Sequence, residues 1–233
     1  MNIAIVGATG NVGRKLIEVL EKKQFPIDEL FLIASSKSVG KKINFKGKEH
    51  SIHDLESFDF SSVKIAFFSA GSAIADKWAP IAAQKTIVID NSKFFRMDPE
   101  VPLIVPEVNS KDLKNYKKKN IIANANCSVI PLVVALKPLH DLYAIKRIVA
   151  STYQSVSGAG KASMDELLSQ TKDFFEGKEL NSKFFTKQIA FNAIPHIDSF
   201  LEDGYTKEEQ KMHDEVKKIL DSKIKITSTS VRI

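Results

Sequence analysis

The chain has 233 residues, of which 43% are hydrophobic and 27% charged, with a formal net charge of +6 and a single cysteine. A folded chain of this length buries about 70–75% of its unfolded surface, which excludes disorder and predicts one or two domains with a real core. One cysteine cannot close an intramolecular disulfide, and no basic leader with an apolar segment precedes Asn2. These features predict a cytoplasmic protein without a membrane segment.

The positive charge raises the question of a nucleic-acid partner. Only residues 111–119 (KDLKNYKKK) form a basic run, and no aromatic or glycine-arginine pattern accompanies it. We interpret this run as a solvated loop and expect no nucleic-acid binding, whereas small anionic ligands suit a basic chain. The histidines have no metal-ligand spacing, so no metal is predicted.

The first half of the chain alternates apolar runs with helical patterns. Ile3–Val6 is a short continuous apolar run, typical of a strand buried on both faces of a parallel sheet. The segments that continue the alternation are 11–23 (helix), 30–34 (strand), 65–68 (strand), 73–84 (helix), 86–90 (strand), 121–123 (strand) and 129–142 (helix). This order predicts an α/β fold with a Rossmann-like doubly wound parallel sheet.

The character of the sequence changes after this sheet. A long β-branched segment at 145–156 predicts a strand, 163–175 an amphipathic helix, 177–187 a polar loop and 206–221 a further helix. The chain ends in a strand-like segment from residue 224. We therefore predict a domain boundary near Cys127, with a first domain at 1–126 and an incomplete α+β domain at 127–233.

A glycine loop connects the first strand to the first helix. Residues 7–13 read Gly-Ala-Thr-Gly-Asn-Val-Gly, and a turn free of Cβ atoms lets the backbone approach a pyrophosphate at a helix N-terminus. A merely tight turn is the alternative, but the strand–turn–helix context favours dinucleotide binding. The second strand ends in residues 34–38 (ASSKS), without an acid for ribose hydroxyls, so NADP is favoured over NAD.

Cys127 follows a predicted strand and begins a predicted helix, where backbone N–H groups and the helix dipole favour a thiolate. A lone cysteine is more often a small buried hydrophobe. Its neighbours Asn126 and Ser128 and its place at the carboxyl end of a parallel strand indicate a nucleophile instead. A nucleophilic cysteine with a nicotinamide cofactor implies aldehyde-level chemistry through a thioester, and the basic chain suggests phosphate as the leaving group.

Several sequence blocks extend this interpretation to a family. With the glycine loop, the blocks SAGS (69–72), DNSKFFRMDPEVPLIVPEVN (90–109), NANCS (124–128), YQSVSGAG (153–160), AFNAIPHID (190–198), YTKEEQKM (205–212) and SVRI (230–233) resemble aspartate-semialdehyde dehydrogenases over the whole chain. The resemblance implies NADPH-dependent reduction of 4-phospho-L-aspartate to L-aspartate 4-semialdehyde and phosphate, in the pathway to lysine and diaminopimelate, methionine, threonine and isoleucine. It also implies an NADP-binding domain at 1–126, a catalytic and dimerisation domain at 127–233, and a homodimer of the full-length form.

The resemblance assigns roles to individual residues. Cys127 would be the acyl-thioester nucleophile, Gln154 would position the substrate, Glu208 would bind its amino group and Arg232 its α-carboxylate. These charges suit those groups, although each charged side chain is otherwise an ordinary surface residue. The remaining implied positions are Arg96, Asn126 and Lys211 for phosphate, Thr9, Gly10, Asn11 and Val12 for pyrophosphate, Lys37 and Ser38 for the 2′-phosphate, and Ser157 and Gly158 beside the nicotinamide.

The end of the chain departs from the family pattern. The family's acid–base histidine lies a few residues beyond the match that ends at Ile233, and none of the histidines present takes its place. We therefore expect a fragment of the full enzyme that binds NADP weakly and turns over slowly, since loss of a general acid costs about 10²–10⁴-fold.

Three alternatives remain at this point. A non-catalytic NADP-binding or dimerisation paralogue would not need the whole set of substrate residues. N-acetyl-glutamyl-phosphate reductase shares the plan, but its cysteine is typically followed by Tyr-Pro, whereas Cys127 precedes Ser128 and Val129. Glyceraldehyde-3-phosphate dehydrogenase lacks the DNS-x-x-FRMD block.

Overall fold

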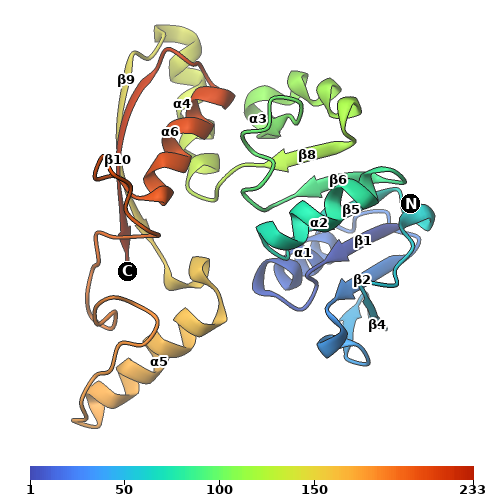
Figure 1. Ribbon diagram of the computed structural model, residues 1–233, viewed down its shortest axis with the longest axis horizontal. Helices are drawn as coiled ribbons and strands as arrows, with labels where there is room; N and C mark the ends of the chain where they lie inside the picture. Colours follow the sequence, from blue (N-terminus) through green and yellow to red (C-terminus); the bar gives the residue numbers. More distant parts are fainter. The chain divides into compact units, whose positions relative to one another are not determined.

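The computed structural model describes residues 1–233, which form two compact units, Met1–Asn126 and Cys127–Ile233 (Figure 1). Each unit has its own sheet and its own cluster of buried apolar side chains. None of the helices has the length and apolar character that crossing a membrane requires.

The first unit contains an eight-stranded sheet in the order β3-β4-β2-β1-β5-β6-β8-β7. Every ladder is parallel except the β3–β4 pair, so the predicted doubly wound sheet is confirmed. Because β1 pairs with β2 on one side and with β5 on the other, the strand order reverses at β1, and ligands bind at the carboxyl end of such a reversal. The strands are β1 (Ile3–Val6), β2 (Leu30–Ala34), β3 (Lys42–Phe45), β4 (Lys48–Asp54), β5 (Ile65–Phe68), β6 (Ile87–Asp90), β7 (Leu103–Ile104) and β8 (Ile121–Asn124).

Helices cover this sheet with their apolar sides. In α1 (Asn11–Lys22), Ile17 and Leu20 are buried in a cluster with side chains of β1 and β2. In α2 (Ser72–Ala83), the buried side chains are all alanines, which lets the helix lie close to β5, β6 and β8. The short helical segments are α3 (Pro106–Asn109), η1 (Ser36–Ser38), η2 (Phe60–Ser62) and η3 (Ser110–Lys118).

Two segments of the first unit differ from the sequence prediction. The lysine run lies in the 3-10 helix η3 rather than in a loop, although most of its lysines are exposed as expected. Residues 42–54, which received no assignment, form the β3–β4 hairpin. Its turn residues Lys46 and Gly47 both have positive φ, and the Gly47 N–H donates to Asn44 Oδ1 at 3.0 Å. The Lys-Gly pair is therefore the feature of the sequence that could have predicted a hairpin here.

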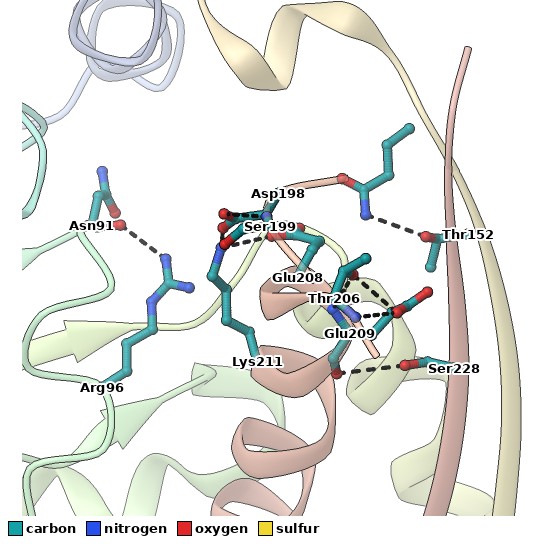
Figure 2. Close-up of polar contacts among 11 residues, drawn as sticks. Asn91, Arg96, Thr152, Asp198, Ser199, Thr206, Glu208, Glu209, Lys211 and Ser228 are labelled. Carbon is teal, nitrogen blue, oxygen red and sulfur yellow. Dashed lines mark hydrogen bonds and ion pairs between the residues drawn. The ribbon is translucent and has the colours of Figure 1, made fainter. Parts of the chain in front are cut away.

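The second unit is built on two parallel strands with helices packed against them. The strands β9 (Arg147–Gln154) and β10 (Lys225–Arg232) pair along their whole lengths, and this register places Gln154 opposite Arg232. Helix α6 (Lys207–Ile219) packs against β10 and α4 (Val129–Tyr143), and it begins with a capping box between Thr206 and Glu209 (Figure 2). The unit also contains η4 (Val156–Ala159) and α5 (Lys161–Phe175).

Candidate active site

The glycine loop of the first unit has a shape that only glycine permits. Gly7 has a φ of +86°, and a Cβ there would lie 2.7 Å from the carbonyl oxygen of Ser69. A Cβ on Gly13 would lie 2.3 Å from the carbonyl oxygen of Gly7. No side chain caps the N-terminus of α1, where the helix dipole favours an anion. These features fit the pyrophosphate of a dinucleotide.

A cavity of about 370 Å³ lies over this loop. Of the predicted cofactor residues, Thr9 and Gly10 line it, together with small and apolar side chains at the carboxyl ends of β1, β2 and β5. Asn11 and Val12 begin α1 beside it, and Lys37 and Ser38 lie in η1 directly after β2. Lys37 is exposed, as a contact to an added phosphate group requires.

An amide network lies at the ends of β6 and β8 in the first unit. The Asn91 side chain donates to Ser69 Oγ at 3.0 Å and accepts from the Asn124 side chain at 2.7 Å. The Arg96 Nη2 donates to the backbone oxygen of Asn91 at 3.0 Å (Figure 2). Burial raises the pKa of the Asp90 carboxyl, although hydrogen bonds from Ser92 and the charge of Arg96 oppose this shift. The predicted residue Arg96 is therefore bonded to the backbone of Asn91, whose side chain belongs to an amide network that the sequence did not reveal.

The second unit contains a cavity of about 420 Å³ that brings together three of the predicted substrate residues, Glu208, Lys211 and Arg232. The ammonium group of Lys211 lies 2.8 Å from Glu208 Oε2 and 3.0 Å from Asp198 Oδ2 (Figure 2). Desolvation lowers the pKa of Lys211, but its hydrogen bonds and charge interactions with Glu208 and Asp198 outweigh this effect and raise it. Lys211 is therefore a cation at neutral pH.

Arg232 forms another side of this cavity and is only 6% exposed. Its Nη1 donates to the backbone oxygen of Ser155 at 2.6 Å. A Cβ on Gly158 would lie 3.3 Å from this Nη1. Burial lowers the pKa of the Arg232 guanidinium, while the charges of Glu208 and Cys127 act in the opposite direction. The absence of a side chain at Gly158 thus leaves room for the guanidinium, and the predicted Ser157–Gly158 pair lies in η4 next to it.

The predicted nucleophile lies immediately before α4. Cys127 is a free, exposed thiol, and the helix begins two residues later at Val129, with Ser128 at the N-cap. Gln154 ends β9, and its side-chain amide donates to Thr152 Oγ1 at 3.2 Å. Asn126 is buried and is the last residue of the first unit.

Sequence reasoning missed some residues that line this cavity. Asp198 pairs with Lys211 and has a φ of +69°, a conformation that Asp adopts more readily than most residues. His196 stacks on Phe200 with ring centroids 4.5 Å apart, and Phe185 closes another side. The block at 190–198 pointed to this segment without assigning a role to any of these side chains.

Comparisons with known proteins agree with this architecture. A family model described as semialdehyde dehydrogenase, NAD binding domain, matches residues 2–116, and one described as semialdehyde dehydrogenase, dimerisation domain, matches residues 136–233. An aspartate-semialdehyde dehydrogenase of Aquifex aeolicus is 56% identical over 99% of this chain and 69% of its own length. Aspartate-semialdehyde dehydrogenase 2 of Vibrio cholerae is 52% identical over 100% of this chain and 69% of its own length.

A solved structure gives the same result. The crystal structure of aspartate semialdehyde dehydrogenase II from Vibrio cholerae, complexed with ASA, matches with a TM-score of 0.98 and 51% identity, covering 100% of this chain and 70% of that one. The fold and the glycine loop define a nicotinamide-dependent oxidoreductase. More particularly, the chain belongs to the aspartate-semialdehyde dehydrogenase family. Its activity is that of an NADP-dependent, phosphorylating aldehyde dehydrogenase, rather than that of a binding-only paralogue or of another reductase.

Proposed function

We propose that the charged cavity of the second unit binds the aspartyl part of 4-phospho-L-aspartate, which is reduced to L-aspartate 4-semialdehyde and phosphate. The observation that carries this proposal is the grouping of one buried acid, Glu208, with two cations, the buried Arg232 and the partly buried Lys211, in one cavity. An amino acid with a phosphorylated side chain presents the complementary set: an ammonium, a carboxylate and a phosphate.

Each charged residue has a partner on that substrate. The guanidinium of Arg232 binds the α-carboxylate through paired N–H donors, and the carboxylate of Glu208 accepts from the amino group. Lys211 binds the phosphate as a point charge. For Arg96 and the Asn126 amide, phosphate binding stays the prediction that the family resemblance makes. The raised pKa of Lys211 supports this role because it keeps the positive charge in place across the neutral range.

The chemistry takes place at the Cys127 sulfur. The thiolate attacks the acyl carbonyl carbon, a C–S bond forms, the C–O bond to phosphate breaks, and phosphate leaves with the electron pair. NADPH, when bound, supplies the hydride that reduces the resulting thioester. The C–S bond then breaks, the aldehyde leaves, and Cys127 returns as a thiolate. Gln154 orients the acyl group from the end of β9 during both steps.

The cofactor residues divide by the part of NADP that they contact. Thr9, Gly10, Asn11 and Val12 would hold the pyrophosphate at the N-terminus of α1, which no side chain caps. Lys37 and Ser38 would bind the 2′-phosphate from η1, which follows the strand end where an NAD enzyme usually has an acid. Ser157 and Gly158 would contact the nicotinamide, as the family resemblance implies.

We propose that the two units correspond to two functional domains and that the enzyme forms a dimer. Residues 1–126 bind the cofactor, and residues 127–233 carry catalysis and dimerisation, which gives a homodimer. The match to a dimerisation domain over 136–233 supports this assembly. Because the reaction needs Cys127 as a reduced thiol, we place the enzyme in the reducing cytoplasm. Its product serves the synthesis of lysine, methionine, threonine and isoleucine.

The direct test is the reverse reaction. The wild-type chain should reduce NADP in the presence of aspartate semialdehyde and phosphate. Leaving out phosphate, or replacing the thiol by Cys127→Ala, should abolish the rise in NADPH absorbance. N-acetyl-glutamate semialdehyde is the matched control substrate because its nitrogen carries no charge for Glu208 to bind. Equal rates with both aldehydes would contradict the substrate assignment.

A further inference from the structure

One wall of the charged cavity is a loop without regular secondary structure. We define the wall loop as residues 181–190; Phe184, Phe185 and Thr186 of this loop line the cavity that also contains Glu208 and Arg232. Loops of this kind are usually mobile unless their backbone groups are bonded to a rigid element.

The wall loop is bonded to α5 through two buried side chains one helical turn apart. The carboxylate of Glu166, which is 9% exposed, accepts from three consecutive backbone N–H groups of the loop. Its Oε2 accepts from Lys183 at 2.9 Å and also from Phe184, and its Oε1 accepts from Phe185 at 3.2 Å. One side chain thus fixes the backbone of the residues that face the cavity.

Gln170 fixes both ends of the same loop and is only 1% exposed. Its Oε1 accepts from the N–H groups of Ile189 at 2.9 Å and Ala190 at 3.0 Å. Its Nε2 donates to the carbonyl oxygen of Asn181 at 3.0 Å and to Ser182 Oγ at 3.3 Å. The same Nε2 also donates to Glu166 Oε1 at 3.4 Å, so this amide bonds both to the loop and to the other side chain that holds it.

The same helix also supports the segment on the other side of the cavity. Ser163 Oγ donates to the carbonyl oxygen of Val156 in η4 at 2.6 Å. Val156, Ile189 and Ile194 form a buried apolar cluster against which Phe185 packs. Helix α5 therefore connects the wall loop to the η4 segment that contains Gly158.

We propose that Glu166 and Gln170 are positioning residues for substrate binding, because they hold the wall loop against the cavity that contains Glu208, Lys211 and Arg232. Neither side chain touches the substrate, and both act through the loop backbone. The proposal rests on the function proposed for this cavity, and the experiment must separate the failure of one from the failure of the other.

The first measurement is amide hydrogen exchange of the whole chain. Glu166→Gln replaces one acceptor oxygen by a donor facing N–H groups, so exchange at 183–185 should accelerate about 10-fold or more. Asp165→Asn is the matched control, because it removes the same charge from the next residue of α5, where the carboxylate is exposed and pairs with Lys161 at 2.7 Å. Unchanged exchange at 183–185 in Glu166→Gln would overturn the proposal.

The second measurement is protection of Cys127 from iodoacetamide by aspartate semialdehyde, which needs no turnover. The half-protecting concentration should rise about 5–30-fold in Glu166→Gln, because the cavity wall is no longer fixed, and stay unchanged in Asp165→Asn. The alkylation rate without substrate should be the same in both, which distinguishes lost positioning from general unfolding. Faster loop exchange with unchanged protection would also overturn the proposal.

Two further variants complete the design. Gln170→Met keeps the side-chain volume and removes all its hydrogen bonds. Amide exchange should therefore accelerate at 189–190, and aspartate semialdehyde should protect Cys127 less well. If Glu166→Gln does not fold, Gln170→Met tests the proposal by the same two measurements. Arg232→Leu should weaken protection whatever the loop does. If Arg232→Leu has no effect, the function proposed for the cavity is wrong rather than the positioning role alone.

Discussion

The two cavities of this chain are built in opposite ways. The cofactor cavity of the first unit is made of backbone and small side chains, and its central part is the continuous segment 7–13. The cavity of the second unit is lined by buried and partly buried charged side chains from separate segments, with Glu208 and Lys211 on α6 and Arg232 on β10. The cofactor cavity depends on the absence of Cβ atoms at its glycines, whereas the charged cavity depends on the balance between its acidic and basic side chains.

The largest effect should come from filling the backbone site. Gly13→Val would place a Cβ 2.3 Å from the Gly7 carbonyl oxygen, so the loop must shift, and NADP affinity should fall by about 100-fold or more. Isothermal titration of NADP into the variant measures this loss. Gly40→Ala is the control for backbone strain away from the loop, because Gly40 has a φ of +85° but a Cβ there meets no atom within 4 Å. Retained NADP affinity in Gly13→Val would contradict the view that this site is made by backbone shape.

The side-chain site should respond to charge rather than to volume. Arg232→Leu leaves Glu208 buried with one cation fewer and removes the paired donors to a carboxylate, so the KM for aspartate semialdehyde should rise about 100-fold. Arg232→Lys should recover only part of the loss, since a lysine cannot donate in a paired fashion. Steady-state kinetics of both variants, with NADP affinity as the internal reference, gives the comparison. Equal KM values in the two variants would argue against carboxylate binding at this position.

A smaller effect is expected at the edge of the cofactor cavity. Lys37→Ala removes an exposed charge from the residues after β2, so the Kd for NADP should rise about 5-fold while the Kd for NAD stays unchanged. Fluorescence titration with both cofactors at two salt concentrations measures the difference. A parallel loss for NAD would show that Lys37 does not contact the 2′-phosphate.

The smallest effect concerns His213, a buried residue of α6. Burial lowers the pKa of His213, and the charge of Lys217 acts in the same direction, while Asp214, Glu209 and Asp203 oppose the shift. The unfolded chain therefore binds more protons than the folded chain, so stability from this group is present above pH about 6.5 and is lost as the pH falls through the lowered value. Urea unfolding of the wild type and of His213→Gln between pH 7.5 and 5 measures this loss.

The His213→Gln variant should flatten that part of the pH profile. A glutamine can still hydrogen-bond to Ser228, whose Oγ lies 3.0 Å from His213 Nε2, so the neutral-pH stability should change little. If the unfolding free energy of His213→Gln falls between pH 7.5 and 5 as steeply as that of the wild type, groups other than His213 cause the loss of stability.

The sequence predicted the first unit better than the second because its determinants are local. The apolar run of β1, the glycine loop and α1 follow one another, and strand–helix alternation leaves few topologies. The β3–β4 hairpin was missed because alternation of strands and helices does not include it. The charged cavity was reached only through resemblance, since the parallel pairing of β9 with β10 brings together residues far apart in the chain.

The support of that cavity could not be predicted at all. Glu166 and Gln170 lie on a helix whose sequence is amphipathic, where polar side chains are ordinarily solvated. Their partners are backbone N–H and carbonyl groups of residues 181–190, and backbone groups are the same in every sequence. Only the folded structure identifies such bonds.

The most direct test of the account is acylation of Cys127 by fresh 4-phospho-L-aspartate in the absence of NADPH. Acyl transfer to the thiol releases phosphate and leaves the thioester with no hydride to consume it. Intact-mass and peptide mass spectrometry should find one aspartyl adduct, on Cys127, with one equivalent of phosphate released and neither in Cys127→Ala. An unmodified chain, or an adduct on another residue, would contradict the assignment of Cys127 as the nucleophile.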